Sequence, residues 1–127
     1  MIDVEIRYTN TKEEKATGIP HYLRITVSGH ATGKGAEAGE PATYHEAICA
    51  SVTTLCTAVA ERLKGSVEQF NETKWCQLVK GRFEYYTSGK RFDLERDTTL
   101  DVLVWGLWWL YRNYKPYFGK FDISRDE

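Results

Sequence analysis

The chain has 127 residues, of which 42% are hydrophobic and 28% charged, a balance typical of one soluble globular domain. Its 17 basic and 18 acidic residues give a net charge of −1, so there is no basic surplus that would predict direct binding to nucleic acid. Its three cysteines include no Cys-x-x-Cys pair, which argues against a disulfide framework or a zinc knuckle.

The sequence has no pattern typical of a targeting signal. The first residues lack a basic region followed by a long apolar run, so a secretory signal is not expected. The longest apolar run, residues 102–111, is too short to span a bilayer. We therefore expect a single domain over residues 1–127, located in the cytoplasm and without a membrane partner.

The first third of the chain predicts two strands. Residues 2–8 alternate between apolar and polar side chains, and the alternation returns over residues 21–28. The polar residues 9–20 between them are interpreted as a long mobile loop. The second strand ends just before Gly29 and His30. The glycine-rich residues 32–42 then form either a simple connector or a lid that closes over a substrate.

The remaining residues predict two helices and further strands. Thr43 and Glu46 form a plausible capping box, and apolar residues then recur at helical spacing until Gly65 ends the helix. Residues 75–79 and 83–87 are typical of two tightly joined strands. A second helix is predicted from about Thr98 to Tyr114, and Lys120 to Ile123 can add a short edge strand.

The predicted order β-β-α-β-β-α indicates an α+β fold, a two-layer sandwich with two helices packed on one face of an antiparallel sheet. The second helix is apolar nearly all round, because Val102, Trp105, Trp108 and Trp109 lie outside its core stripe. A domain of this size cannot easily bury such a helix on all sides. The pattern therefore predicts a homodimer through the Trp-rich C-terminal helix.

Cys49 and His30 are the candidate catalytic residues. A thiol becomes a nucleophile when a base takes its proton and an electropositive setting favours the thiolate. His30 at the end of a strand is the candidate base, and the start of the predicted helix would favour the thiolate of Cys49. His45, four residues before Cys49, is a rival base. The alternative interpretation is that Cys49 is a small buried helix residue and His30 an exposed loop residue.

Other assignments of these groups are weaker. Cys56 and Cys76 are expected in the core, and Cys56 lies seven residues along the helix from Cys49, roughly 10 Å of rise, which is too far for a redox disulfide. A metal site from His30, His45, Glu46 and Cys49 can be drawn, but no spacing demands one. We expect no metal and no cofactor, and no role is assigned to His21.

These residues resemble a known family, the ribosomal-processing cysteine proteases, Prp. The family has Gly-His-Ala after its second strand, which matches Gly29-His30-Ala31 here. It also has an acidic residue, two apolar residues and Cys-Ala at the helix start, which matches Glu46-Ala47-Ile48-Cys49-Ala50, followed by Val52-Thr53. The opening Met1-Ile2-x-Val4 and the closing Gly106-Leu107-x-x-Leu110 with Tyr114 extend the resemblance over nearly the whole chain.

The resemblance implies a cytoplasmic, homodimeric cysteine endopeptidase in which Cys49 is the nucleophile and His30 its base. Family members remove an N-terminal extension from the large-subunit ribosomal protein numbered twenty-seven. Gly29, Glu46, Tyr44 and Thr53 would support the site or line the peptide groove, with Glu46 or a backbone carbonyl orienting His30.

The chain also departs from the family pattern. The segment between the histidine and the cysteine is longer, Glu46 stands where aspartate is common, and Thr53 replaces a common serine. These differences leave open an alternative function: a non-proteolytic binding module of the same fold, associated with ribosomes or phage.

Overall fold

The structure is a computed structural model that describes residues 1–29, 42–64, 74–79, 82–89 and 91–126, with the backbone alone for 42–45 and 74–79. Its elements, in chain order, are β1 (Ile2–Thr9), α1 (Lys12–Thr17), β2 (His21–Gly29), α3 (Ala42–Leu63), β3 (Lys74–Val79), β4 (Arg82–Thr87), α4 (Leu94–Asn113), the short 3-10 helix η1 (Lys115–Tyr117) and β5 (Phe118–Arg125).

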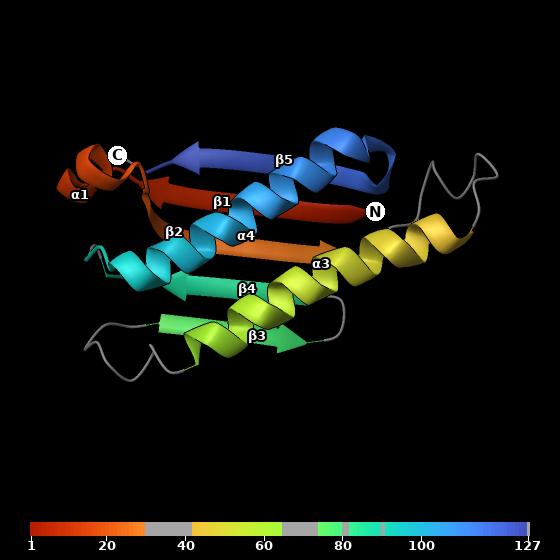
Figure 1. Ribbon diagram of the computed structural model, residues 1–127, viewed down its shortest axis with the longest axis horizontal. Coiled ribbons are helices and arrows are strands. Elements are labelled where there is room, and N and C mark those ends of the chain that lie inside the picture. Colours follow the sequence, from red (N-terminus) through yellow and green to blue (C-terminus); the bar gives the residue numbers. More distant parts are fainter. Residues whose placement is uncertain (30–41, 65–73, 80–81, 90, 127) are drawn as a thin grey trace.

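The strands form one five-stranded sheet in the order β3-β4-β2-β1-β5, and α3 and α4 both cross the same face of it (Figure 1). The predicted α+β two-layer sandwich is therefore confirmed. Four strands pair antiparallel, whereas β5 runs parallel to β1 and makes the sheet mixed. This direction arises because α4 and η1 return the chain to the start of β1, where Phe118 lies opposite Ile2.

The core lies between the sheet and the two long helices. The alternation of β1 buries Ile2, Val4 and Ile6, each at most 1% exposed. Side chains at helical spacing on α3 and α4 cover them: Ile48, Val52, Cys56, Val59, Leu63, Leu100, Leu103, Leu107 and Leu110. Gly106 lets the two helices approach, since a Cβ there would lie 3.0 Å from a methyl carbon of Leu55.

Residues 9–20, predicted as a loop, contain the short helix α1. None of its residues is buried, so there was no apolar periodicity to reveal it. Its local signals are polar: Glu13 and Glu14 occupy the first turn, where they favour the helix dipole. Gly18 follows its last residue in the left-handed conformation, with φ 73°, which glycine adopts without strain.

Both long helices begin earlier than predicted. Asp93 caps α4, because its side chain accepts a hydrogen bond from the backbone N–H of Arg96 at 2.7 Å. The predicted start at Thr98 missed this turn, since Arg96 and Asp97 are charged. α3 begins at Ala42, so Thr43 lies inside the helix and the predicted capping box is wrong. Residues 32–41 and Gly65 lie outside the described residues.

Candidate active site

Gly29 fixes the backbone that leads into the first candidate motif. It ends β2 opposite Ile2 of β1, with a φ of +94°. A Cβ at this position would lie 2.1 Å from the carbonyl oxygen of Met1, a distance that real side chains do not reach. Both the positive φ and the close approach require glycine here. Gly29 thus fixes the backbone at the end of β2.

The end of β2 and the first turns of α3 lie at the same end of the molecule (Figure 1). The fold therefore brings Gly29, the described residue of the first motif, to the end of the molecule where α3 begins. His30 itself lies outside the described residues, as do the side chains of Tyr44 and His45. The pairing of His30 with Cys49 consequently remains a prediction.

Cys49 and Cys56 are both reduced thiols on α3, but their surroundings differ. Cys49 is half-buried and packs against the edge of the hydrophobic core. Cys56 is 2% exposed and belongs to that core, as predicted. The two lie seven residues apart on one continuous helix. Cys49 is therefore the more accessible thiol; the side chain of Cys76 is not described.

The position of Cys49 within the helix differs from the prediction. α3 begins at Ala42, seven residues before Cys49, so the thiol stands about 10 Å along the axis from the helix start. The N–H groups without an intrahelical partner, and most of the positive dipole, belong to residues 42–45. Cys49 therefore lies beyond the first turn of α3, and activation of its thiol by the helix N-terminus stays a prediction.

Two of the predicted supporting residues share a side of α3 with Cys49. Glu46 precedes it by three residues and Thr53 follows by four, spacings at which helix side chains are neighbours. Both Glu46 and Thr53 are exposed. A half-buried thiol thus lies between a carboxylate and a hydroxyl on an accessible helix side, which is suited to contact with a ligand.

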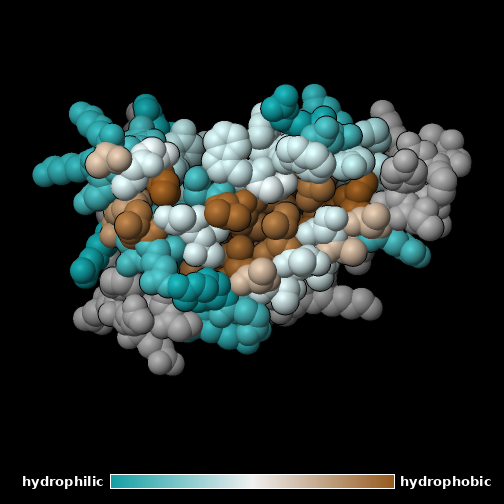
Figure 2. Space-filling view, viewed as in Figure 1, coloured by the Kyte–Doolittle hydropathy of each residue, from teal (hydrophilic) through white to brown (hydrophobic). Residues whose placement is uncertain are grey.

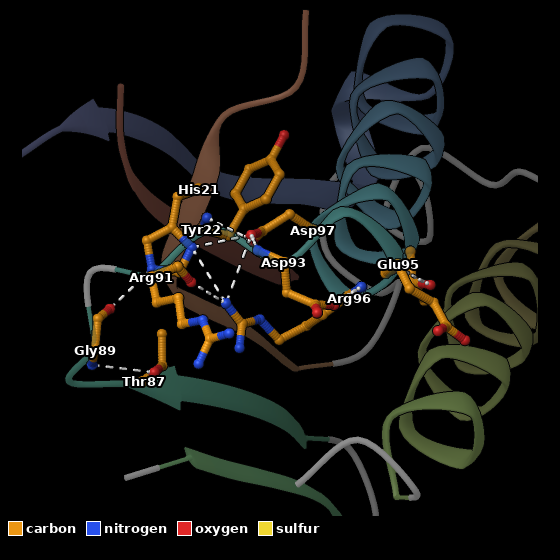
Figure 3. A network of polar contacts seen from close by, with 10 residues as sticks. His21, Tyr22, Thr87, Gly89, Arg91, Asp93, Glu95, Arg96 and Asp97 are labelled. Carbon is orange, nitrogen blue, oxygen red and sulfur yellow. Dashed lines mark hydrogen bonds and ion pairs between the residues drawn. The ribbon is translucent and has the colours of Figure 1, made fainter. Parts of the chain in front are cut away.

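A second polar cluster, which the sequence did not reveal, surrounds His21 (Figure 3). The Nδ1 atom of His21 lies 3.0 Å from an oxygen of Asp97, and Nε2 lies 2.8 Å from the carbonyl oxygen of Gly89. Asp97 also accepts hydrogen bonds from the backbone N–H groups of Tyr22 and Asp93, each at 3.0 Å. His21 and Asp97 are both fully buried.

Arg96 completes this cluster. Its guanidinium donates to the carbonyl oxygen of Arg91 at 2.6 Å and lies 3.6 Å from the carboxylate of Asp97. The cluster joins the start of β2 to the start of α4, at the end of the molecule away from the first turns of α3 (Figure 1). We assign it a structural role, since loss of one partner of a buried charged pair would leave the other charge uncompensated in the core.

The cluster sets the pKa of His21. Burial alone would lower the pKa of this imidazole, and the nearby Arg96 acts in the same direction. The hydrogen bonds to Asp97 and to the carbonyl of Gly89, with the negative charge of Asp97, outweigh them and raise the pKa above its usual value. Only one feature of the sequence could have indicated this cluster. Asp93 is a residue type that often caps helices, and a helix that begins after Asp93 places Asp97 in its first turn.

The described part of the chain shows neither a metal site nor a membrane-spanning helix. Within it, no group of three or more histidine, cysteine, aspartate or glutamate side chains is arranged to hold a metal ion. The histidines of the candidate metal set, His30 and His45, lie beyond what this finding covers. None of the described helices is long and apolar enough to cross a membrane.

The fold has counterparts among solved structures. The essential ribosomal processing protease Prp from S. aureus, in complex with a covalently linked product peptide, is 15% identical over 99% of this chain and 100% of that chain, with a TM-score of 0.60. The same protease with a substrate peptide is 13% identical over the same shares, with a TM-score of 0.62. SMU.848 from Streptococcus mutans is 15% identical over 99% of this chain and 96% of that chain, with a TM-score of 0.62.

No protein-family model matches the chain, and no curated protein matches its sequence. The chain nevertheless has the fold of the Prp proteases over almost its entire length. The resemblance read from the Gly29-His30-Ala31 and Glu46-to-Ala50 motifs is thus confirmed at the level of the fold.

Proposed function

We propose that the chain is a cysteine endopeptidase of the Prp type that acts in the cytoplasm. Cys49 would be the nucleophile and His30 its base. The substrate would be the N-terminal extension of the large-subunit ribosomal protein numbered twenty-seven. One observation carries this proposal: the chain shares its fold over 99% of its length with a processing protease that was solved with bound peptides. In this fold the end of β2, at Gly29, and the first turns of α3 lie at the same end of the molecule (Figure 1).

The proposed chemistry follows from the two side chains. His30 takes the thiol proton of Cys49, and the thiolate attacks the carbonyl carbon of the scissile peptide bond. The tetrahedral intermediate collapses to a thioester as the C–N bond breaks, and protonated His30 gives its proton to the leaving amine. His30 then deprotonates a water molecule that hydrolyses the thioester. The products are a carboxylic acid, an amine and the restored thiol.

The oxyanion formed in the first step needs hydrogen-bond donors. The N–H of Cys49 is four residues past the positions that lack helical partners, so in the described conformation it is committed to the helix. Two sources of donors are compatible with the proposal. The donors either come from the segment preceding α3, or become available when peptide binding opens the first turns of α3.

The supporting residues have distinct proposed roles. Gly29 would set the direction in which the chain leaves β2 towards His30, and the backbone at this position requires glycine. Glu46, exposed one turn before Cys49, would orient His30 or bind the substrate backbone. Tyr44 and Thr53 would line the groove for an extended peptide, over which residues 32–42 would close.

The proposal is tested by incubating the full-length ribosomal protein from the same genome with the native chain and two serine variants, followed by mass spectrometry. We expect one cut near the substrate's N-terminus by the native protein and by Cys56→Ser, and none by Cys49→Ser. Cys56→Ser is the matched control, because it makes the same atomic change on the same helix. Equal cleavage by Cys49→Ser would overturn the proposal.

A second candidate function is a non-proteolytic binding module of the same fold. The position of Cys49 two turns inside α3 favours it, because a thiol there receives little activation from the helix start. This candidate predicts that the native chain and Cys49→Ser bind the ribosomal protein equally and that neither cuts it. A binding measurement in parallel with the cleavage assay separates the two functions.

We also propose a homodimer through α4. Val102, Trp105 and Trp109 form its exposed apolar surface, with exposed fractions of 61%, 65% and 56%. Their spacing of three and four residues places them on one side of the helix. Large exposed apolar side chains so grouped are typical of an interaction surface. A second copy that meets this surface by twofold symmetry would bury it.

A further inference from the structure

A groove of about 310 Å³ opens at the α1 end of the molecule, between α4 and the strands β1 and β2. This volume falls at the lower end of the range of ligand pockets. Its walls combine aromatic rings with carboxylates, contributed by Tyr8, Tyr22, Trp105, Trp108, Glu14 and Asp101. The first turns of α3 lie at the other end of the molecule (Figure 1). The groove is thus separate from the candidate active site.

The charge of the groove is negative. Among the described residues that line it there is no lysine, arginine or histidine. Tyr22 donates a hydrogen bond from its hydroxyl to a carboxylate oxygen of Asp101. Burial, followed by the hydrogen bond and charge of Asp101, raises the pKa of Tyr22, so that the phenol stays protonated and donates to Asp101.

Glu14 is the less available of the two carboxylates. In the amide orientation that suits both Glu14 and Arg125, the NH₂ group of Asn10 donates to the carboxylate of Glu14 at 2.6 Å. The amide oxygen of Asn10 then accepts from Arg125 at 3.2 Å. Asp101, by contrast, makes no ion pair with any described residue. The negative charge that a ligand would meet inside the groove is therefore mainly that of Asp101.

We propose that this groove binds an arginine side chain of a polypeptide partner, with the guanidinium on the aromatic rings and paired with Asp101. Cations are attracted to the faces of tryptophan and tyrosine rings, and carboxylates supply the complementary charge. A planar guanidinium both stacks on such rings and forms parallel hydrogen bonds to a carboxylate, which an ammonium group cannot do.

The surroundings of the groove indicate a polypeptide rather than a free small cation. Trp105 forms one wall and is continuous along α4 with the exposed side chain of Trp109. The helix-bearing face also carries a band of hydrophobic side chains between α3 and α4 (Figure 2). A small cation would not contact the ring of Trp109. A segment with apolar residues beside an arginine can contact this ring as well as the groove, and it would then compete with the proposed homodimer for α4.

Nuclear magnetic resonance of the four tryptophan indole N–H groups tests the proposal. The protein is the full chain carrying Cys49→Ser, so that no cleavage occurs and the result does not depend on the proposed function. The probe is the capped peptide acetyl-Leu-Arg-Leu-Arg-Leu-amide. Its comparison is the same peptide with citrulline at both arginine positions, which keeps the shape of the side chain and removes its charge.

We expect the arginine peptide to shift the indole signals of Trp105 and Trp108, and the citrulline peptide to bind at least tenfold more weakly. Asp101→Asn should weaken binding about tenfold or more, because it removes a charged hydrogen-bond partner. Trp105→Leu should weaken it roughly two- to fivefold through loss of the ring. Asp122→Asn, an exposed carboxylate on β5 that does not line the groove, is the matched control and should have no effect.

Four results would overturn the proposal that the groove binds an arginine side chain of a polypeptide. Equal binding of the arginine and citrulline peptides would show an apolar groove without cation recognition. Equal affinity for free arginine amide and for the peptide would exclude a polypeptide partner. Shifts of Trp105 and Trp108 that follow protein concentration and do not change when the peptide is added would show that a second copy occupies the groove. No shift at millimolar peptide would also overturn the proposal.

Discussion

The imidazole of His21 lies 3.0 Å from the carboxylate of Asp97, although the two residues are 76 positions apart in the sequence. The other ring nitrogen faces the carbonyl oxygen of Gly89, which can only accept a hydrogen bond. An imidazole donates from both nitrogens only when it is protonated. His21 and Asp97 therefore form a buried ion pair that ties the start of β2 to the first turn of α4.

This pair predicts that stability falls as the pH rises. The folded-state pKa of His21 is above its unfolded value of 6.5, so its contribution is fully present below pH 6.5. The contribution is lost as the pH rises through the folded pKa. Urea unfolding from pH 5.5 to 9 should show the free-energy difference between the native chain and His21→Gln shrinking with pH. A constant difference across this range would contradict a charged His21.

Loss of the Asp97 carboxylate should lower the free energy of unfolding more than loss of the His21 charge. Asp97→Asn leaves a buried cationic imidazole and weakens acceptors for two backbone N–H groups, so we expect a loss of about 3–5 kcal/mol in the free energy of unfolding. Asp126→Asn is the control, because it breaks the exposed ion pair of Asp126 with Arg7 and should cost no more than about 1 kcal/mol. Similar losses for the two variants would refute the importance of the buried cluster.

Gly18 and Gly29 both have a positive φ, but only Gly29 lies against another strand. A comparison of alanine variants at the two positions therefore measures the cost of the contact at Gly29. Gly18→Ala meets nothing within 4 Å, so it reports only the cost of the left-handed backbone, about 1 kcal/mol. Gly29→Ala adds the contact of 2.1 Å with the Met1 carbonyl, and we expect a distinctly larger loss, more than about 2 kcal/mol. Chemical unfolding of both variants compares them. Equal losses would mean that the start of β1 moves aside without cost.

The elements with clear periodicity were predictable from the sequence. β1 and β2 were predicted from the alternation of apolar and polar residues over 2–8 and 21–28. α3 was predicted from the helical spacing of apolar residues from Ile48 to Leu63. Both patterns arise because one face of each element is buried. α1 was missed because it buries nothing, and the first turn of α4 because its buried residues are charged. The parallel direction of β5 depends on the path of the preceding helix, which no local pattern contains.

The candidate site was only partly predictable. The exposed side of α3 that carries Glu46, Cys49 and Thr53 follows from helical spacing, and the burial of Cys56 was anticipated. The start of α3 at Ala42 was not, because Thr43 and Glu46 imitate a capping box inside the helix. The partnership of His21 with Asp97 lies beyond sequence reasoning, since tertiary contact alone brings the two residues together.

The difference in burial between Cys49 and Cys56 predicts a difference in reactivity. Iodoacetamide should modify Cys49 at least tenfold faster than Cys56 in the folded protein, because the thiol of Cys56 must wait for an opening of the core. Site-resolved mass spectrometry over a time course measures both rates. In urea the two rates should become similar. Faster modification of Cys56 in the native state would contradict the arrangement of α3.

The proposed dimer predicts a change of mass on substitution of a single tryptophan. Trp109→Lys places a charge in the apolar surface of α4 and should convert the dimer into a monomer. Lys120→Ala, on the exposed β5, is the control. Sedimentation equilibrium measures the mass of each variant. A native chain that is already monomeric at 100 µM, roughly the upper limit of a weak homodimer, would refute the interface.

The central claim is that Cys49 forms a thioester with the substrate. Hydroxylamine added during cleavage intercepts a thioester and leaves a hydroxamate at the new carboxyl end of the released extension, which mass spectrometry distinguishes from the ordinary acid. We predict the hydroxamate with the native chain and with Cys56→Ser, and neither product with Cys49→Ser. Cleavage that yields only the acid at saturating hydroxylamine, or any cleavage by Cys49→Ser, would contradict the account.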